Sequence, residues 1–235
     1  MLTIEKLNQF YGESHTLWDL DLDVPEGQCT CVMGRNGVGK TTLMKAIMGE
    51  VAVKSGQLRY QGEGRDIELT QKAVEARSRL GIGFVPQGRQ IFPLLSVEEN
   101  LRTGLAARRD GLKKIPERIY ELFPVLKQMK HRRGGDLSGG QQQQLAIGRA
   151  LVIEPKLLIL DEPGEGIQPN IVAQIGQVIR QLIKEDGLTV LLVEQKLPFA
   201  RKYADRFVIM DRGRPVAKGE IAELSNELIK QHLTV

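Results

Sequence analysis

Residues 34–41 read GRNGVGKT, a stretch that fits the phosphate-loop pattern GxxxxGK[ST]. An apolar run at residues 28–33 precedes it, and a helical stripe of Leu43, Ala46 and Ile47 follows it. The glycines let backbone N–H groups wrap a polyphosphate, and the helix directs its positive end to the same place. The stretch therefore predicts a strand–loop–helix unit that binds the phosphates of a nucleotide.

Two side chains of this unit carry specific chemistry. Lys40 supplies a cation for the outer phosphates, and the Thr41 hydroxyl is placed to bind Mg²⁺. A glycine-rich turn without this role would not require Lys-Thr after its last glycine. The residues predicted to bind nucleotide here are Gly34, Arg35, Asn36, Gly37, Val38, Gly39, Lys40, Thr41 and Thr42.

A pair of carboxylates, Asp161 and Glu162, follows the apolar run 157–160. Parallel sheets bind their ligands at the carboxyl ends of buried strands. Asp161 is predicted to hold Mg²⁺ directly or through water, and Glu162 to polarise the attacking water. The alternative is a polar strand end that stops at Pro163.

The segment LSGGQ, residues 137–141, opens a predicted helix. Its start exposes unpaired N–H groups and a hydroxyl, which makes a second anion site. An ordinary capped helix start would look similar. However, one phosphate loop already wraps one triphosphate, so a second site indicates another role.

Four motifs in this order carry a resemblance: GRNGVGKT, Gln87 within GFVPQGRQIFP, LSGGQ and LLILDE. Together they resemble the ATP-binding cassette (ABC) family over essentially the whole chain. The resemblance implies ATP hydrolysis with ATP and Mg²⁺, by two cassettes that pack head to tail. It also implies that Gln87 completes the Mg²⁺ shell and that Tyr11 stacks on adenine; alternatively, Tyr11 is an ordinary surface or core aromatic. The residues implied to contact the partner's nucleotide are Ser138, Gly139, Gly140 and Gln141.

Two departures from the usual cassette pattern lie near the carboxylates. Residues 193–196 read VEQK, so Gln195 stands where many cassettes have a histidine, while His15, His131 and His232 lie elsewhere. An amide can hydrogen-bond a γ-phosphate but cannot carry a positive charge. In residues 164–169, GEGIQP, Gln168 replaces the usual aspartate and Gly164 a common hydroxyl residue. The predicted catalytic residues are Lys40, Glu162 and Gln195.

These departures narrow the resemblance. VEQ together with EGIQP resembles the second ATPase of branched-chain amino acid and amide importers, the LivF-like family. LNQFYGESHTLWDL, HRRGGDLSGGQQQQLAIGRAL, VEQKLPFARKYADRF and the terminal HLTV are more similar to the UrtE type from urea importers. Urea is therefore the expected solute, with branched-chain amino acids as the alternative. No residue of this chain touches the solute.

The resemblance also implies partners. They are a sister ATPase in a mixed dimer (a homodimer in isolation), two transmembrane permease subunits and, indirectly, a periplasmic solute-binding protein. The chain is then expected on the cytoplasmic face of the inner membrane. Residues 88–94 contain Ile91, Phe92, Pro93 and Leu94, apolar enough either to receive a permease helix or to pack on the domain itself. A soluble non-transport ABC ATPase and a non-hydrolysing regulatory subunit are alternatives.

Composition and sequence patterning limit which partners, locations and metal sites are expected. The net charge of +4 does not by itself indicate nucleic acid, which is not an expected partner. No apolar run approaches the about 20 residues of a membrane helix, and the first residues do not resemble a signal peptide. Cys29 and Cys31 lie two apart on one predicted strand, without companions for a zinc site. We expect buried, reduced thiols.

The predicted fold is α/β: a P-loop NTPase cassette with a RecA-like parallel-sheet core, an N-terminal antiparallel β subdomain and an inserted helical subdomain. We expect one domain over 1–235, with a core in 1–95 and 153–219, a helical subdomain in 96–152 and a tail in 220–235.

Local patterns predict further elements. Leu20, Leu22 and Val24 alternate with aspartates as in a half-buried strand, and Leu58 and Tyr60 alternate before a turn at 62–64. In the middle third, the apolar residues of 115–123 fall on one helical face, Pro124 should break that helix, and residues 108–114 should form an exposed turn.

The last third should alternate between helices and strands. Asn170 is expected to cap a helix that ends at Gly187, and a strand over 188–193 should follow. Residues 207–210 and 215–218 should form a hairpin.

Overall fold

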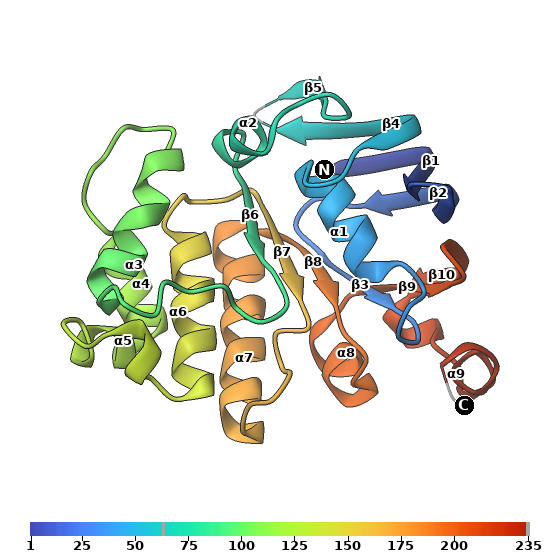
Figure 1. The fold of residues 1–235 in the computed structure, drawn as a ribbon. Helices are drawn as coiled ribbons and strands as arrows, with labels where there is room; N and C mark the ends of the chain where they lie inside the picture. The colour runs from blue at the N-terminus through green and yellow to red at the C-terminus, as the bar shows by residue number, and fades with distance from the viewer. Residues whose placement is uncertain (63, 234–235) are drawn as a thin grey trace.

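In a computed structural model, residues 1–62 and 64–233 form a six-stranded sheet, a four-stranded sheet and helices around them (Figure 1). The predicted turn at 62–64 and the tail to 235 each include residues outside this described part. The strands are β1 (Leu2–Tyr11), β2 (Ser14–Val24), β3 (Cys29–Met33), β4 (Val53–Gly62), β5 (Arg65–Glu68), β6 (Ile82–Val85), β7 (Leu157–Asp161), β8 (Thr189–Val193), β9 (Arg206–Asp211) and β10 (Arg214–Glu220). The helices are α1 (Lys40–Met48), α2 (Val74–Arg79), α3 (Val97–Thr103), α4 (Glu117–Leu122), α5 (Pro124–Gln128), α6 (Gly139–Leu151), α7 (Pro169–Asp186), α8 (Leu197–Tyr203) and α9 (Asn226–His232).

The larger sheet has the strand order β10-β9-β3-β8-β7-β6. All neighbours pair in parallel except β10, which runs antiparallel to β9 as the expected hairpin. The phosphate loop leaves the end of β3, and the two acidic residues end and follow β7. Only β8 separates these two strands, so the loop and the acids meet at one edge of the sheet.

The smaller sheet is antiparallel, in the order β2-β1-β4-β5. It contains the alternating strands expected around Leu20 and Leu58, both of which are buried. Figure 1 shows it packed beside α1 on one face of the larger sheet. The antiparallel N-terminal part of the predicted fold is confirmed.

Two apolar cores lie on opposite faces of the larger sheet. Leu157 and Ile159 of β7 join α1 and the small sheet in one core, whereas Leu158 and Leu160 join the helices α6 and α7 in the other. This alternation follows from the two-residue period of a strand. Because both faces are covered, the strand is apolar throughout, as parallel sheets usually are.

The helical middle third is confirmed, with one correction. The helix breaks at Pro124: α4 ends at Leu122 and α5 begins at the proline. The residues 108–114, expected to be an exposed turn, begin with a buried side chain. Arg108 is 9% exposed because its guanidinium donates to the Val152 carbonyl oxygen at 2.9 Å and pairs with Asp110 and Glu154.

The start of α7 also differs from the prediction. Gln168 is the N-cap and Asn170 lies inside the first turn. Pro169 explains the shift, because its fixed φ and missing N–H suit the first helical position. The other end is as expected, since Gly187 closes the helix at φ 64°.

Both cysteines are buried, and each is free of disulfides. Burial raises the pKa of the Cys29 thiol to about 12, so it stays protonated and chemically inert. Among the described helices, none combines the length and the apolar character needed to cross a bilayer.

Candidate nucleotide-binding site

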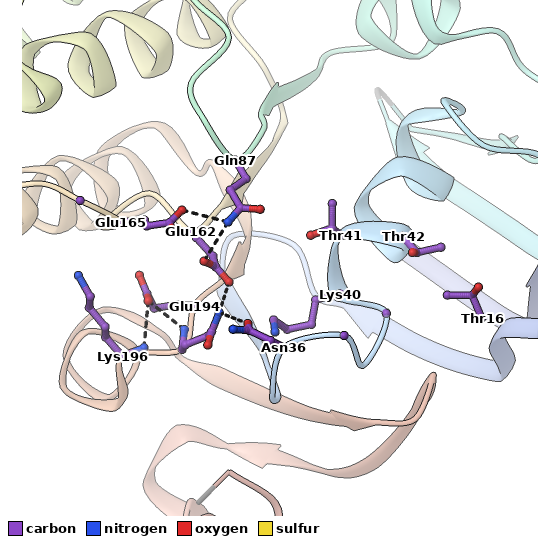
Figure 2. Close-up of a pocket in the computed structure, with 14 residues that line it drawn as sticks. Thr16, Asn36, Lys40, Thr41, Thr42, Gln87, Glu162, Glu165, Glu194 and Lys196 are labelled. Carbon is purple, nitrogen blue, oxygen red and sulfur yellow. Dashed lines mark hydrogen bonds between the residues drawn. The ribbon is translucent and has the colours of Figure 1, made fainter. Parts of the chain in front are cut away.

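An open pocket of about 700 Å³ lies at the edge of the sheet where the phosphate loop meets the acidic pair (Figure 2). Of the predicted site residues, the structure brings together Asn36, Gly37, Gly39, Lys40, Thr41, Thr42, Gln87, Glu162 and Gln195. The remaining lining residues are Thr16, Glu165, Gly166, Glu194 and Lys196. A polar pocket of this size accommodates a nucleotide.

The phosphate loop has the backbone that its glycines predict. Gly39 has φ 104°, which a residue with a side chain rarely adopts. At Gly34 a Cβ atom would lie 2.5 Å from the Met210 carbonyl oxygen, so no side chain fits there. Gly39 caps α1 without a side-chain hydrogen bond, which leaves the first N–H groups of the helix available to an anion. Gly34, Arg35 and Val38 belong to this loop without lining the pocket.

Lys40 begins α1 and is 5% exposed. Its ammonium donates to the carbonyl oxygens of Gly34 at 2.8 Å and Arg35 at 2.9 Å. Burial lowers its pKa, against the opposing attraction of Glu162 and Asp161. The loop therefore holds the cation in place at the pocket.

Asp161, at the end of β7, is 2% exposed, and neither carboxylate oxygen has a hydrogen-bond partner among the described residues. Burial raises its pKa to about 6, against the lowering effect of the nearby Thr41 hydroxyl and Lys40. The Thr41 hydroxyl is close but makes no hydrogen bond of normal geometry to this carboxylate, and a buried carboxylate in this state suits a divalent cation. No group of three or more acidic, histidine or cysteine ligands occurs in the described chain. Mg²⁺ fits such a site, because it is commonly held by one or two carboxylates together with substrate phosphates.

The Glu162 carboxylate is held by two amides, one on each oxygen. Gln195 Nε2 donates to Oε1, and Gln87 Nε2 lies 3.5 Å from Oε2. The second hydrogen of Gln195 Nε2 goes to Asn36 Oδ1 at 2.8 Å. The amide at the usual histidine position is thus committed to the carboxylate and the phosphate loop. Glu162 itself adopts φ 50°, a conformation uncommon for a residue with a side chain.

Gln87 has a second acceptor that the sequence prediction missed. Its Nε2 donates to Glu165 Oε2 at 3.0 Å, and Figure 2 shows the amide between this carboxylate and Glu162. The available signal was that Glu165 lies in the segment 164–169 that departs from the usual cassette pattern.

The other missed residues lie next to predicted ones. Glu194 is 3% exposed; its Oε1 accepts from the backbone N–H groups of Gln195 and Lys196, both at 2.9 Å. Lys196 Nζ donates to the Gly164 carbonyl oxygen at 2.7 Å, which ties the VEQK segment to the GEGIQP segment. Thr16, on β2, had no sequence signal that distinguished it from other strand residues.

The signature residues do not line this pocket. Ser138 caps α6, and its hydroxyl accepts from the Gln141 N–H at 3.4 Å while the Gln141 side chain accepts from the Ser138 N–H. Gly139 and Gly140 form the first turn of α6. The start of α6 is thus a capped helix end that lies apart from the pocket.

The aromatic and histidine residues lie outside the pocket lining. Tyr11 ends β1 and is 48% exposed. His15 is stacked between Phe10 and Trp18, with ring centroids 3.9 and 3.6 Å away. No histidine lines the described pocket, and Gln195 occupies the position where many cassettes have one.

The phosphate loop, the acidic pair at the end of β7 and the sheet order define a P-loop nucleotide hydrolase. The profile of the ABC transporter family matches residues 17–165. The chain is 42% identical over 217 residues to the high-affinity branched-chain amino acid transport ATP-binding protein BraG of Pseudomonas aeruginosa, covering 92% of this chain and 91% of the relative. It is 38% identical to the probable branched-chain amino acid transport ATP-binding protein LivF of Archaeoglobus fulgidus, with coverage of 95% and 94%.

Among solved structures, the dimeric post-hydrolysis state of the ATP-binding cassette MJ0796, bound to ADP and Pi, superposes with a TM-score of 0.83. That match has 25% identity and covers 94% of this chain and 99% of the other. The chain belongs to the ABC transporter family. It has the ABC cassette fold and is the ATP-binding, ATP-hydrolysing subunit of an importer.

Proposed function

We propose that the chain powers import of branched-chain amino acids through a pair of permease subunits, as one of two different ATPases. The identity to BraG and LivF over more than nine-tenths of this chain carries this proposal. The match to arginine and glutamine transport ATP-binding proteins is weaker, at 34% and 32% identity. The chain then works at the cytoplasmic face of the inner membrane, supplied by a periplasmic solute-binding protein.

Urea is a second candidate solute. It is favoured by the likeness of LNQFYGESHTLWDL and VEQKLPFARKYADRF to urea-importer ATPases of the UrtE type. The two candidates share one site chemistry, because the solute never reaches this subunit. Only a measurement of solute uptake can distinguish the two candidate solutes.

Uptake in the source cell tests both solutes. We expect deletion of this chain to abolish uptake of labelled leucine, and the wild-type chain but not Lys40→Ala to restore it. Loss of urea uptake with intact leucine uptake would select the second candidate. If both solutes still enter normally, the chain is not an importer motor for either.

Residue roles follow from the site. The phosphate loop and Lys40 bind the triphosphate. Thr41, Asp161 and Gln87 would hold Mg²⁺, which supplies charge neutralisation for the phosphates when bound. Glu162 polarises the attacking water, and Gln195 keeps its carboxylate oriented by hydrogen bonding. Tyr11 would stack on adenine from the exposed end of β1.

The signature lies outside this chain's own pocket, which supports pairing with a second cassette, in our proposal a different ATPase. We propose that Ser138, Gly139, Gly140 and Gln141 close over the nucleotide of a sister ATPase. That sister subunit then supplies its own signature to the pocket described above. Affinity purification of the membrane complex should yield two different ATPase chains in equal amounts; a complex with this chain alone would contradict the mixed dimer.

A groove of about 570 Å³ supports the permease contact. Gln90, Phe92 and Arg149 line it, and Phe92 is 48% exposed with the Arg149 guanidinium 5.3 Å from its ring centre. Leu94, two residues after Phe92, is 80% exposed, whereas Ile91 packs against the core. We propose that this groove receives a permease helix, and that Phe92→Asp releases the chain from detergent-solubilised permease without changing its ATP affinity.

A further inference from the structure

The side chain of Gln87 has two chemically different ends. Its NH₂ group only donates hydrogen bonds, and its carbonyl oxygen only accepts them or binds a metal. Both neighbours of the NH₂ group are carboxylates, which accept: Glu165 Oε2 at 3.0 Å and Glu162 Oε2 at 3.5 Å. In Figure 2 the oxygen end of Gln87 points to the side on which Thr41 lies.

Of the two carboxylates, Glu165 is the stronger determinant of this orientation. A separation of 3.0 Å is an ordinary hydrogen bond, whereas 3.5 Å lies at the limit of one. Glu162 is in addition bonded to Gln195 through its other oxygen. An amide that turned over would place its oxygen against Glu165 and lose this bond.

The backbone of Glu165 is fixed from two directions. Its N–H donates to the Glu162 carbonyl oxygen at 3.1 Å, and its carbonyl oxygen accepts from Arg89 Nη2 at 3.4 Å. Arg89 Nη1 also reaches Gln142 Oε1 of α6 at 3.3 Å. Glu165 therefore joins the segment after β7 to the segment that contains Gln87.

We propose that Glu165 is a positioning residue that orients the Gln87 amide, so that its carbonyl oxygen faces the metal–nucleotide site. The inference rests on the proposed role of Gln87 as a metal ligand. The role assigned to Glu165 is exerted through Gln87, although Glu165 also lines the pocket. It acts by making the opposite orientation of the amide unfavourable.

The test measures metal binding on the purified full-length chain, with Mn²⁺ as the probe and a non-hydrolysable ATP analogue present. Electron paramagnetic resonance reports free and bound Mn²⁺. We expect Glu165→Ala to weaken Mn²⁺ binding about tenfold, because both the acceptor and its charge are lost. We expect Glu165→Gln to weaken it no more than about threefold, because its side-chain oxygen still accepts from Gln87. Binding of the analogue is also measured in EDTA, so that the metal-dependent loss is separated from any change in the pocket that Glu165 lines.

A double-mutant cycle separates orientation from the general effect of charge. In a Gln87→Ala background, Glu165→Ala should weaken Mn²⁺ binding no more than about threefold. Glu227→Ala, which removes an exposed charge from α9, should have no effect. A tenfold loss that persists without Gln87, or equal losses in Glu165→Gln and Glu165→Ala, would overturn the proposal. The result does not depend on the transported solute, so it stands apart from the uptake experiment.

Discussion

At the scale of single residues, Asp161 shows a conflict between folding and function. The fold buries this carboxylate without a hydrogen-bond partner among the described residues, and burial raises its pKa to about 6. A carboxyl whose pKa is higher in the folded state binds its proton more tightly there. Its ionised form therefore destabilises the metal-free fold, fully at pH values above 6 and not at all below its unfolded value near 4.

We predict that Asp161→Asn raises the stability of the chain without metal and nucleotide. The gain should reach about 3 kcal/mol at pH 8 and fall to about 0.5 kcal/mol at pH 4, because the pKa rises by about two units and each unit corresponds to about 1.4 kcal/mol. Urea unfolding in EDTA at the two pH values measures it. Asp66→Asn, at an exposed position, is the control. A loss of stability at pH 8 would contradict the account.

Other features of single residues could not be predicted from the sequence. Gln195 contacts Glu162 across 33 positions, and Gln87 contacts Glu165 across 78. The family resemblance assigned Gln87, Glu162 and Gln195 to one site, but the direction of each amide depends on neighbours that only the folded chain brings together. Glu165 was missed for this reason.

At the scale of elements, Arg108 fastens the 108–114 segment to the end of α6. Its side chain is 3% exposed and bonds the Val152 carbonyl oxygen, with Asp110 and Glu154 as ion-pair partners. A run rich in arginine and lysine is normally solvated, so the sequence favoured an exposed turn. The structure differs because the guanidinium satisfies a helix-end carbonyl that would otherwise be buried alone.

Arg108→Met should therefore destabilise the chain by about 2 kcal/mol, because the Val152 carbonyl oxygen loses its buried donor. Lys113→Met, at an exposed position of the same segment, should change stability by less than about 0.5 kcal/mol. Denaturant midpoints of the two variants give the comparison. Equal midpoints would show that Arg108 is not a fastening point.

The contact between α7 and α8 depends on a missing side chain. A Cβ atom at Gly176 would lie 2.3 Å from a ring atom of Tyr203, whose hydroxyl donates to the Ala173 carbonyl oxygen at 3.2 Å. Because α8 begins two residues after Gln195, this packing also bears on the position of that amide.

Helix propensity alone predicts that Gly176→Ala stabilises α7 by about 1 kcal/mol. We predict the opposite sign, a loss of about 1–3 kcal/mol, because the ring must move. Gln177→Ala, on the exposed side of the same helix, should be nearly neutral. Thermal unfolding measures the sign of the stability change. A Gly176→Ala variant that is more stable than wild type would refute the close packing.

At the scale of the whole molecule, the phosphate loop lines the nucleotide pocket, whereas the signature at the start of α6 does not. The pocket takes its lining from the phosphate loop, the segment after β7 and the VEQK segment, while Ser138 and the start of α6 stay outside it. One chain thus offers a nearly complete pocket and a separate capped helix end. This arrangement agrees with cassettes that work in pairs.

Much of this architecture was predictable, because strand and helix periods and the phosphate loop are local in sequence. The buried runs 28–33 and 157–160 became the parallel strands β3 and β7 on either side of β8, and Pro124 and Gly187 ended helices as expected. The predicted N-cap of α7 was wrong by two residues, because Pro169 outweighs the capping tendency of Asn170. The solute was predicted from resemblance alone, as urea, whereas the relatives with the identities given above are branched-chain amino acid transport ATP-binding proteins.

The central claim is that this chain hydrolyses ATP with Glu162 as the residue that polarises water. The most direct test compares purified wild-type chain and Glu162→Gln in ATP binding and in single-turnover hydrolysis of labelled ATP. We predict ATP affinity within about threefold of wild type and hydrolysis reduced at least about 100-fold, since the amide cannot accept the proton. Hydrolysis by Glu162→Gln at the wild-type rate would contradict the claim.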